Sequence, residues 1–290
     1  MTTQFVHLHL HTEYSMVDSV VRIKPLMEKV AAQGMPAVAL TDQSNLFALV
    51  KFYRAAIAAG IKPIVGVDVW LRNEEQVNQP FRMVLLAQNA TGYANLRLLV
   101  SRSYQEGQHL GRPMLEREWL TPERCEGLIA LSGGRQGDVG RALLAGNGGL
   151  AEELLDGWLE SFGDRYYLQL VRTGRPEEEE CLHASVELAA RRQVPVVATN
   201  EVCFLEPDNF QAHEVRVCIH QGRTLDDPRR PRDYSPQQYL RSPEEMAELF
   251  ADIPEALANT VEIARRCTIE LELGRNYLPD FPVPDGLTMD

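Results

Sequence analysis

The sequence lacks the long apolar runs that mark membrane-spanning proteins. None of its apolar runs approaches the roughly 18 residues that a membrane-spanning helix requires. Its N-terminus has no basic stretch followed by an apolar one, so we expect no secretory signal. The five cysteines are an odd number, and no two of them form a C-x-x-C pair. These absences predict a cytoplasmic protein with reduced thiols and no membrane partner.

Basic residues are also scarce. The chain has 29 Lys and Arg against 41 Asp and Glu, which gives a formal net charge of −12. Proteins that bind nucleic acid place clustered Lys and Arg against the phosphates. The one basic cluster, at 223–232, is interrupted by aspartates and is expected to be a solvated loop. The composition therefore predicts little direct DNA binding.

Histidine is rare as well, yet three of the seven histidines stand within five positions near the N-terminus. His7, His9 and His11 alternate with aliphatic residues, and alternation at period two predicts a β-strand. The three imidazoles would then project from one face, where two of them together chelate a metal such as Zn²⁺ or Mn²⁺. The alternative is a strand whose polar face is solvated.

Short apolar runs alternate with amphipathic stretches over the first 200 residues. The expected strands are 5–10, 37–41, 64–71, 83–87, 128–132, 166–171 and 196–199, and the expected helices are 23–33, 46–59, 93–104, 137–144, 150–162 and 177–192. This alternation predicts a parallel sheet. A closed barrel fits the length better than an open sheet, but the pattern alone leaves both open. Further helices are expected at 208–220, 243–250 and 254–267.

Polar residues near the strand ends are the candidates for chemistry, because ligands gather at the carboxyl ends of parallel strands. The candidates are His9, His11, Asp18, Asp42, Gln43, Asp68, Arg82, Gly134, Glu201 and Cys203. The His, Asp, Glu and Cys side chains among them predict a metal cluster. Asp42 is equally a candidate helix cap.

The C-terminal end changes character. The segment LPDFPVPDG, at 278–286, carries three prolines at alternating positions, which is typical of a stiff, extended linker. We therefore expect one domain over 1–275 and a linker over 276–290, so that the chain is the first module of a longer protein.

Several segments resemble motifs of a known family. HLHLHTEYSMVDS resembles the first motif of the PHP (polymerase and histidinol phosphatase) domains, and LTDQSNLFALVKFYRAAIAAGIKPIVGVDVWL resembles the second and third. The resemblance is specific to the PHP domain at the N-terminus of the alpha subunit of bacterial DNA polymerase III. Stand-alone PHP phosphatases share the metal motifs but lack the segments YANL, TLDDP and NTVEIA.

The resemblance implies a distorted (β/α)₇ TIM-like barrel with a C-terminal helical extension and up to three metals at its mouth. The ligands of the first metal site would be His9, His11, Asp68 and Glu201. The second site would use positions occupied here by Arg82 and Gly134, neither of which ligates metal. The third would use Asp18, Gln43 and Cys203, of which Gln43 is a poor ligand. His7 lies outside these sets and is expected to be a buried structural imidazole.

These departures predict that the three-metal cluster is lost. Phosphoester hydrolysis in such clusters needs adjacent metals, and here at most one divalent ion (Zn, Mn or Mg) would remain. Arg82 would place a guanidinium where a cation sits in the family. The resemblance implies an inactive scaffold that packs against the polymerase core of the same chain and docks the proofreading exonuclease (epsilon) subunit. The alternative is an active metal-dependent phosphoesterase or 3'-5' exonuclease.

Overall fold

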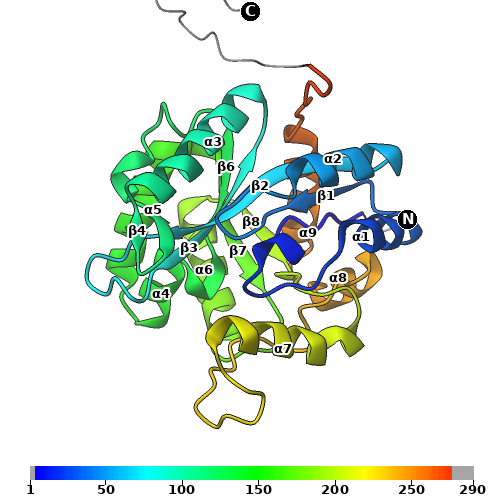
Figure 1. The fold of residues 1–290 in the computed structure, drawn as a ribbon. Coiled ribbons are helices and arrows are strands. Elements are labelled where there is room, and N and C mark those ends of the chain that lie inside the picture. Colours follow the sequence, from blue (N-terminus) through cyan, green and yellow to red (C-terminus); the bar gives the residue numbers. More distant parts are fainter. Residues whose placement is uncertain (1–3, 276–290) are drawn as a thin grey trace, which may run out of the picture.

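Strands and helices alternate along residues 4–275, which the computed structural model describes (Figure 1). The linker expected at 276–290 lies outside the described residues. The strands are β1 (Ala37–Leu40), β2 (Lys62–Leu71), β3 (Phe81–Ala87), β4 (Gln108–His109), β5 (Arg112–Leu115), β6 (Leu128–Leu131), β7 (Tyr166–Val171) and β8 (Val196–Thr199). The helices are α1 (Ile23–Ala32), α2 (Leu49–Ala58), α3 (Ala90–Gln105), α4 (Asp138–Leu144), α5 (Gly148–Phe162), α6 (Glu178–Arg192), α7 (Phe210–Gln221), α8 (Pro243–Leu249) and α9 (Pro254–Arg266).

Local sequence signals explain several of the helix ends. Gly34 and Gly60 follow α1 and α2 with φ of +67° and +71°, the left-handed conformation that ends many helices and favours glycine. Ser242 and Glu245 form a reciprocal capping box at the start of α8, with Pro243 in the first turn. These helices begin and end within a few residues of the predicted bounds because capping residues act locally.

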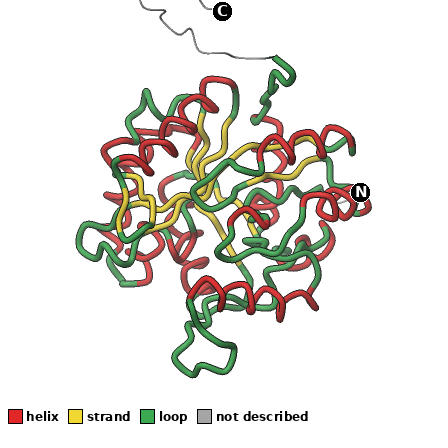
Figure 2. The backbone as a smooth tube through the Cα atoms, viewed as in Figure 1, coloured by secondary structure: helices red, strands yellow, loops and turns green. Residues whose placement is uncertain are grey.

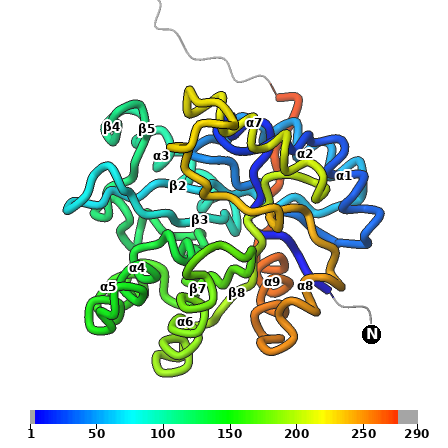
Figure 3. The backbone as a smooth tube through the Cα atoms, turned by 90° about the horizontal axis from the view of Figure 1, so that it is seen from below, coloured from blue at the N-terminus to red at the C-terminus, as the bar shows by residue number. Residues whose placement is uncertain are grey.

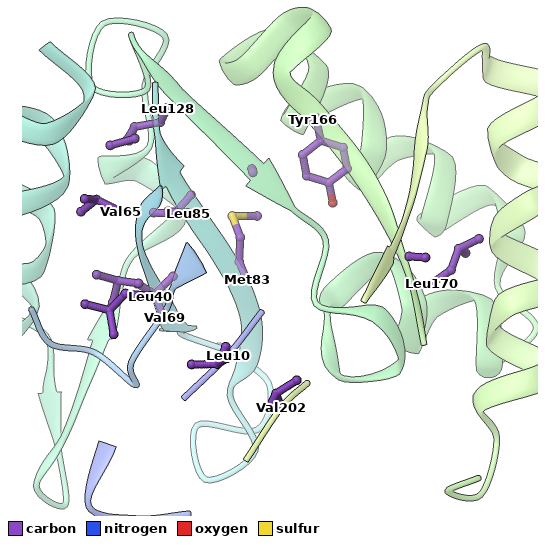
Figure 4. Close-up of a cluster of buried hydrophobic side chains, with 14 of the residues drawn as sticks. Leu10, Leu40, Val65, Val69, Met83, Leu85, Leu128, Tyr166, Leu170 and Val202 are labelled. Atoms are coloured by element: carbon purple, nitrogen blue, oxygen red, sulfur yellow. The ribbon is translucent and has the colours of Figure 1, made fainter. Parts of the chain in front are cut away.

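The strands form a closed ring, which confirms the barrel. Neighbouring strands pair in the order β1, β2, β3, β6, β7, β8. The N-terminal segment closes the ring, because Thr41 N donates to Leu10 O at 3.0 Å on one side and Val202 N donates to His9 O at 3.1 Å on the other. Leu10 and Val202 lie side by side at this junction (Figure 4). Figure 2 shows the strands at the centre of the molecule with helices around them.

The expectation of a parallel sheet is wrong at β3. This strand runs antiparallel to both β2 and β6, whereas β1–β2, β6–β7 and β7–β8 are parallel. The reason is local, because residues 72–80 join β2 to β3 without a crossover helix. The short strands β4 and β5 were not predicted, since their residues show no apolar alternation.

Alternate strand residues face two separate cores. The inner core contains alternate residues of β1, β2, β3, β6, β7 and β8, including Val84 and Leu86 of β3. It also contains Ile263 and Ala264 of α9 and Cys267, which follows that helix. The outer core contains the other alternate residues of the strands and the buried faces of the surrounding helices. Figure 3 shows these helices arranged around the strands. Helix α9 therefore closes the barrel end at which the parallel strands begin. Lys62, the first residue of β2, confirms this by donating from Nζ to Ala264 O at 2.8 Å.

The segment predicted as the first strand is extended but irregular. Val6 and Leu8 belong to the inner core, whereas Leu10 belongs to the outer core. The alternation thus changes phase between Leu8 and His9. His7 consequently points away from His9 and contacts Arg241 O through Nε2 at 2.9 Å. The prediction that His7, His9 and His11 share one face is wrong. The change in alternation between Leu8 and His9 places the His7 side chain on the opposite face of the segment from His9.

The region after β8 extends the barrel with three helices. Helix α7 lies below the strands in Figure 1, and a long loop then leads to α8 and α9. In this loop Arg230 pairs with a part-buried Glu214 of α7, while Arg223 and Arg229 pair with Asp227. The basic cluster is thus neutralised by neighbouring carboxylates. Among residues 4–275, no helix combines the length and apolarity that crossing a membrane requires.

Candidate functional site

The candidate site lies at the barrel end opposite α9. At this end the strand residues that face the barrel interior are polar instead of aliphatic. The residues that line a cavity here are His9, His11, Asp18, Arg82, Glu201, Cys203, Tyr234 and Gln238. The side chains fill this cavity so completely that it has no space for a water molecule. Polar groups buried in this way need partners, and the hydrogen bonds among them define the site.

Asp68 is the hub of the site and is fully buried on β2. Its Oδ2 lies 3.0 Å from His9 Nε2 and 3.1 Å from His11 Nε2. Arg82, on the neighbouring strand β3, donates from Nε to Asp68 Oδ1 at 3.3 Å and from Nη2 to Oδ2. A single carboxylate therefore holds two imidazoles and one guanidinium.

His9 is held as a neutral imidazole. Burial lowers the pKa of His9 well below its ordinary value. The side-chain amide of Gln169 lies 3.0 Å from His9 Nδ1, and Gln169 Oε1 accepts from Gly133 N at 3.2 Å. With its oxygen engaged in this way, Gln169 presents its NH₂ group to His9. Nδ1 of His9 is then the acceptor, and Nε2 carries the proton that it donates to Asp68.

His11 joins this hub to a second cluster. Its Nδ1 lies 2.8 Å from Asp18 Oδ1, and Tyr234 donates its hydroxyl to Asp18 Oδ2 at 3.0 Å. Burial acts to raise the pKa of Asp18, but His11, Arg82 and Tyr234 together outweigh it and the pKa falls well below its usual range. Burial raises the pKa of the Cys203 thiol well above its usual value.

Two triplets of ligand-type side chains converge in the described residues. One is His9, His11 and Asp68, and the other is His11, Asp18 and Cys203, with the donor atoms of each triplet within 4.8 Å of one another. The first offers the two-imidazole, one-carboxylate donor set that suits a first-row divalent ion. The residues therefore fit one such ion in chemistry, although Arg82 occupies the same carboxylate oxygen.

Glu201 lies at the same mouth but is engaged by a different arginine. Arg175 Nη2 lies 2.7 Å from Glu201 Oε2, and Arg175 Nε donates to Glu178 Oε1 at 2.6 Å. Burial acts to raise the pKa of Glu201, but Arg175 and then His9 lower it to about 2. Glu201 has φ of +44°, a strained conformation for a residue with a side chain.

The remaining predicted residues lie at the edge of the site. Gln43 donates from Nε2 to the backbone oxygen of Asp68 at 3.3 Å. Asp42 does not cap α2, whose N-cap is Ala48, and it accepts hydrogen bonds from Thr12 N at 2.6 Å and Ser15 Oγ at 2.8 Å. Gly134 lies in a short turn of 3-10 helix after β6, beside Val171 and outside the cavity around His9.

Sequence reasoning missed several residues of the site, namely Gln136, Gln169, Arg175, Glu178, Tyr234 and Gln238. Arg175 follows β7 closely, so the strand-end rule applied to that strand would have found it. Gln169 lies inside a strand with an apolar pattern and carries no local signal. Tyr234 and Gln238 come from a distant loop that only the tertiary fold brings to the mouth.

Comparison with known proteins agrees with this geometry. The PHP domain family matches residues 7–173. DNA polymerase III subunit alpha of Pseudomonas aeruginosa is 58% identical over 290 residues, which is all of this chain and 25% of that protein. The same subunit of Escherichia coli K12 is 57% identical over 287 residues, or 99% of this chain and 25% of that protein. The chain thus spans about a quarter of the length of these relatives.

Among solved structures, an amidohydrolase from Chromobacterium violaceum matches with a TM-score of 0.48 and 13% identity, over 73% of this chain and 96% of that one. The family match covers more than half of the chain, and the alpha-subunit relatives align along nearly all of it. The chain belongs to the PHP domain family, and along nearly its whole length it is similar to DNA polymerase III subunit alpha.

Proposed function

We propose that this chain is a PHP module that has given up phosphoester hydrolysis and serves as a scaffold in a replicative DNA polymerase. The observation that carries the proposal is the contact between Arg82 and both carboxylate oxygens of Asp68. A fixed guanidinium on the shared ligand competes with a metal for the same oxygen. It also neutralises the charge that a metal would otherwise balance.

The orientation of Gln169 supports the same conclusion. A histidine that ligates metal donates its other ring N–H to a carboxylate or carbonyl oxygen. His11 has this arrangement, since its Nδ1 faces Asp18. His9 has the opposite one, because its Nδ1 faces the amide NH₂ of Gln169 and its Nε2 keeps the proton. The three-metal cluster of the family is thereby reduced to at most one weak site.

That remaining site would use His9, His11 and Asp68, with Glu201 as a fourth ligand released from Arg175. The ion would be a divalent cation such as Zn²⁺, Mn²⁺ or Mg²⁺, and Asp18 and Cys203 offer a weaker neighbouring set. The second metal site lacks a ligand at Gly134, which has no side chain, and the third has only the poor ligand Gln43 in place of a histidine. One isolated ion would lack the adjacent metal that such hydrolysis uses to activate water and stabilise developing charge together.

The module's role would then be structural. Its relatives are four times as long, so the polymerase core would belong to the same protein and would carry DNA-directed DNA synthesis. The five cysteines are all unpaired, which fits the reducing cytoplasm. The net charge of −12 fits a protein partner better than direct contact with DNA.

We also propose that the module docks the proofreading exonuclease subunit. An exposed apolar patch supports a protein contact, because monomeric proteins rarely expose such patches without a partner. Phe47, Tyr104 and Leu110 are 66%, 42% and 87% exposed and line two adjoining hollows between α2, α3 and the β4–β5 turn. In the full-length subunit, Phe47→Ser with Leu110→Ser should weaken co-purification of the exonuclease, whereas Ile57→Ser, on the exposed face of α2 outside the hollows, should not.

The rival function is a metal-dependent phosphoesterase or 3'-5' exonuclease, and the convergence of His9, His11 and Asp68 favours it. Metal content of the purified protein separates the two. Two or three equivalents of Zn, Mn or Fe, resistant to dialysis, would favour the enzyme. No tightly held metal, or one weakly held ion, is the result that the scaffold predicts.

A further inference from the structure

The mouth of the barrel is covered by a loop segment that sequence reasoning did not associate with the site. Residues 234–240, here called the strap, belong to the long loop between α7 and α8 (Figure 2). The strap lies along the chain that leaves β8. Asn200 donates from Nδ2 to Gln237 O and to Tyr239 O, both at 2.8 Å, and Cys203 N donates to Gln238 O at 2.9 Å.

Side chains of the strap reach into the site itself. The Tyr234 hydroxyl donates to Asp18 Oδ2 at 3.0 Å, which is the oxygen that His11 leaves free. Gln238 is 1% exposed and donates from Nε2 to Glu201 O at 3.2 Å. Ser235 donates from Oγ to Thr173 O, in the loop that follows β7. The strap thus spans the mouth from the Asp18 side to the Glu201 side.

The strap also covers the candidate metal ligands, of which His9 and His11 are each 2% exposed. Tyr234 and Gln238 line the cavity together with the candidate metal ligands, and that cavity has no room for a water molecule. A phosphoester cannot reach His9 or His11 while both side chains are seated there. Residues 224–233 just before the strap are mostly exposed. The strap is held by the contacts described above and by Leu240, which is buried in the outer core and donates from N to Phe204 O at 3.0 Å.

We propose that the strap is a closure that seals the barrel mouth, and that the hydrogen bond from Tyr234 to Asp18 is its latch. Opening of the strap would require this bond to break and Gln238 to leave the cavity, with the barrel strands unchanged. The proposal does not depend on whether the site hydrolyses anything, because its consequence is access to the site and not turnover.

Cys203 provides a direct reporter of that access. Its thiol lines the cavity and is 3% exposed, whereas Cys125, Cys181 and Cys267 are buried elsewhere in the barrel and Cys218 lies on α7. Alkylation by N-ethylmaleimide in the full-length protein, followed by peptide mass spectrometry, gives a separate rate for each thiol. A thiol beneath the strap reacts only when the strap opens, so its rate measures the local opening equilibrium.

Tyr234→Phe removes the latch and keeps the ring, and Gln238→Ala removes the second side chain. Tyr234→Phe loses a hydrogen bond to a charged group, so Cys203 should react about ten-fold faster in it. Gln238→Ala loses a hydrogen bond to a backbone oxygen, so Cys203 should react a few-fold faster in that variant. Cys125, Cys181 and Cys267 should keep their rates. Tyr53→Phe is the matched control, because the Tyr53 hydroxyl accepts a hydrogen bond from Leu271 N away from the mouth. An unchanged rate at Cys203 in both strap variants, or equal acceleration of Cys125, Cys181, Cys203 and Cys267, would overturn the proposal.

Discussion

Arg82 and Asp68 face each other on adjacent strands of the barrel. They are not directly opposite, since Asp68 pairs in register with Val84 and Arg82 with Trp70. The guanidinium reaches along the sheet to both carboxylate oxygens, and Arg82 Nη1 also donates to Gln136 Oε1 at 2.8 Å. The pair is buried, with the Asp68 side chain wholly inaccessible. The ion pair therefore couples the candidate metal ligands to the stability of the fold.

Arg82→Ala should destabilise the protein by about 3–5 kcal/mol, because Asp68 is left buried without its cationic partner. Thermal unfolding beside wild type measures the effect, and added divalent metal should partly restore the melting temperature. Arg265→Ala is the control, since its pair with Glu262 is exposed and worth less than about 1 kcal/mol. An unchanged melting temperature in Arg82→Ala would mean that the ion pair does not support the fold.

Arg175 and Glu201 should be energetically coupled. Removing Arg175 leaves Glu201 buried without this cationic partner, whereas removing Glu201 leaves Arg175 paired with Glu178 alone, so the two effects should not simply add. A double-mutant cycle with Arg175→Met and Glu201→Gln should therefore give a coupling energy of about 1–3 kcal/mol in unfolding free energy. Chemical denaturation of the two single variants and the double variant provides the numbers. Simple additivity would show that Glu201 is not compensated by Arg175.

His7 should make stability fall as the pH is lowered. Burial lowers the pKa of His7 from 6.5 to about 4, so between these values the unfolded state binds a proton that the folded state does not. Stability is then lost as pH drops through this window, by about 3 kcal/mol for this residue. Unfolding of His7→Gln, which keeps a donor for Arg241 O, should show a shallower pH dependence than wild type. The exposed His183→Gln should follow wild type, and parallel curves for His7→Gln and wild type would refute a neutral buried imidazole.

Residual metal binding should respond to Gln169. Replacing its NH₂ group by a carboxylate oxygen in Gln169→Glu lets His9 donate from Nδ1 and frees Nε2 for a metal. Affinity for Zn²⁺ or Mn²⁺ should rise by about 10–100-fold, as measured by calorimetric titration. Anomalous scattering from the bound ion should place it against His9, His11, Asp68 and Glu201. An ion bound elsewhere would contradict the assignment of this site.

Much of the barrel could be predicted because its signals are local. β7 and β8 have the expected bounds, since each is a short apolar run between turn residues. The direction of β3 could not be predicted, because a strand carries no local mark of its orientation. The phase shift between Leu8 and His9 could not be predicted either. Histidine and aliphatic residues alternate in the sequence without a break, but the faces to which their side chains point do not.

The site was predictable residue by residue but not as a network. His9, His11, Asp18 and Asp68 stood out by type and position, and the fold brings their donor atoms together. The partners that decide their chemistry come from segments far apart in the chain. Gln169, Arg175 and Tyr234 are ordinary polar residues in the sequence, and only the tertiary fold sets them against the candidate ligands.

The most direct test of the account is hydrolysis by the purified protein in the presence of Mn²⁺. Bis(p-nitrophenyl) phosphate as a generic phosphodiester and p-nitrophenyl phosphate as a phosphomonoester cover both reaction classes, and His9→Ala is the matched control. A metal site closed by Arg82 predicts that wild type and His9→Ala are equally inactive. Mn²⁺-dependent turnover by wild type that disappears in His9→Ala would contradict it.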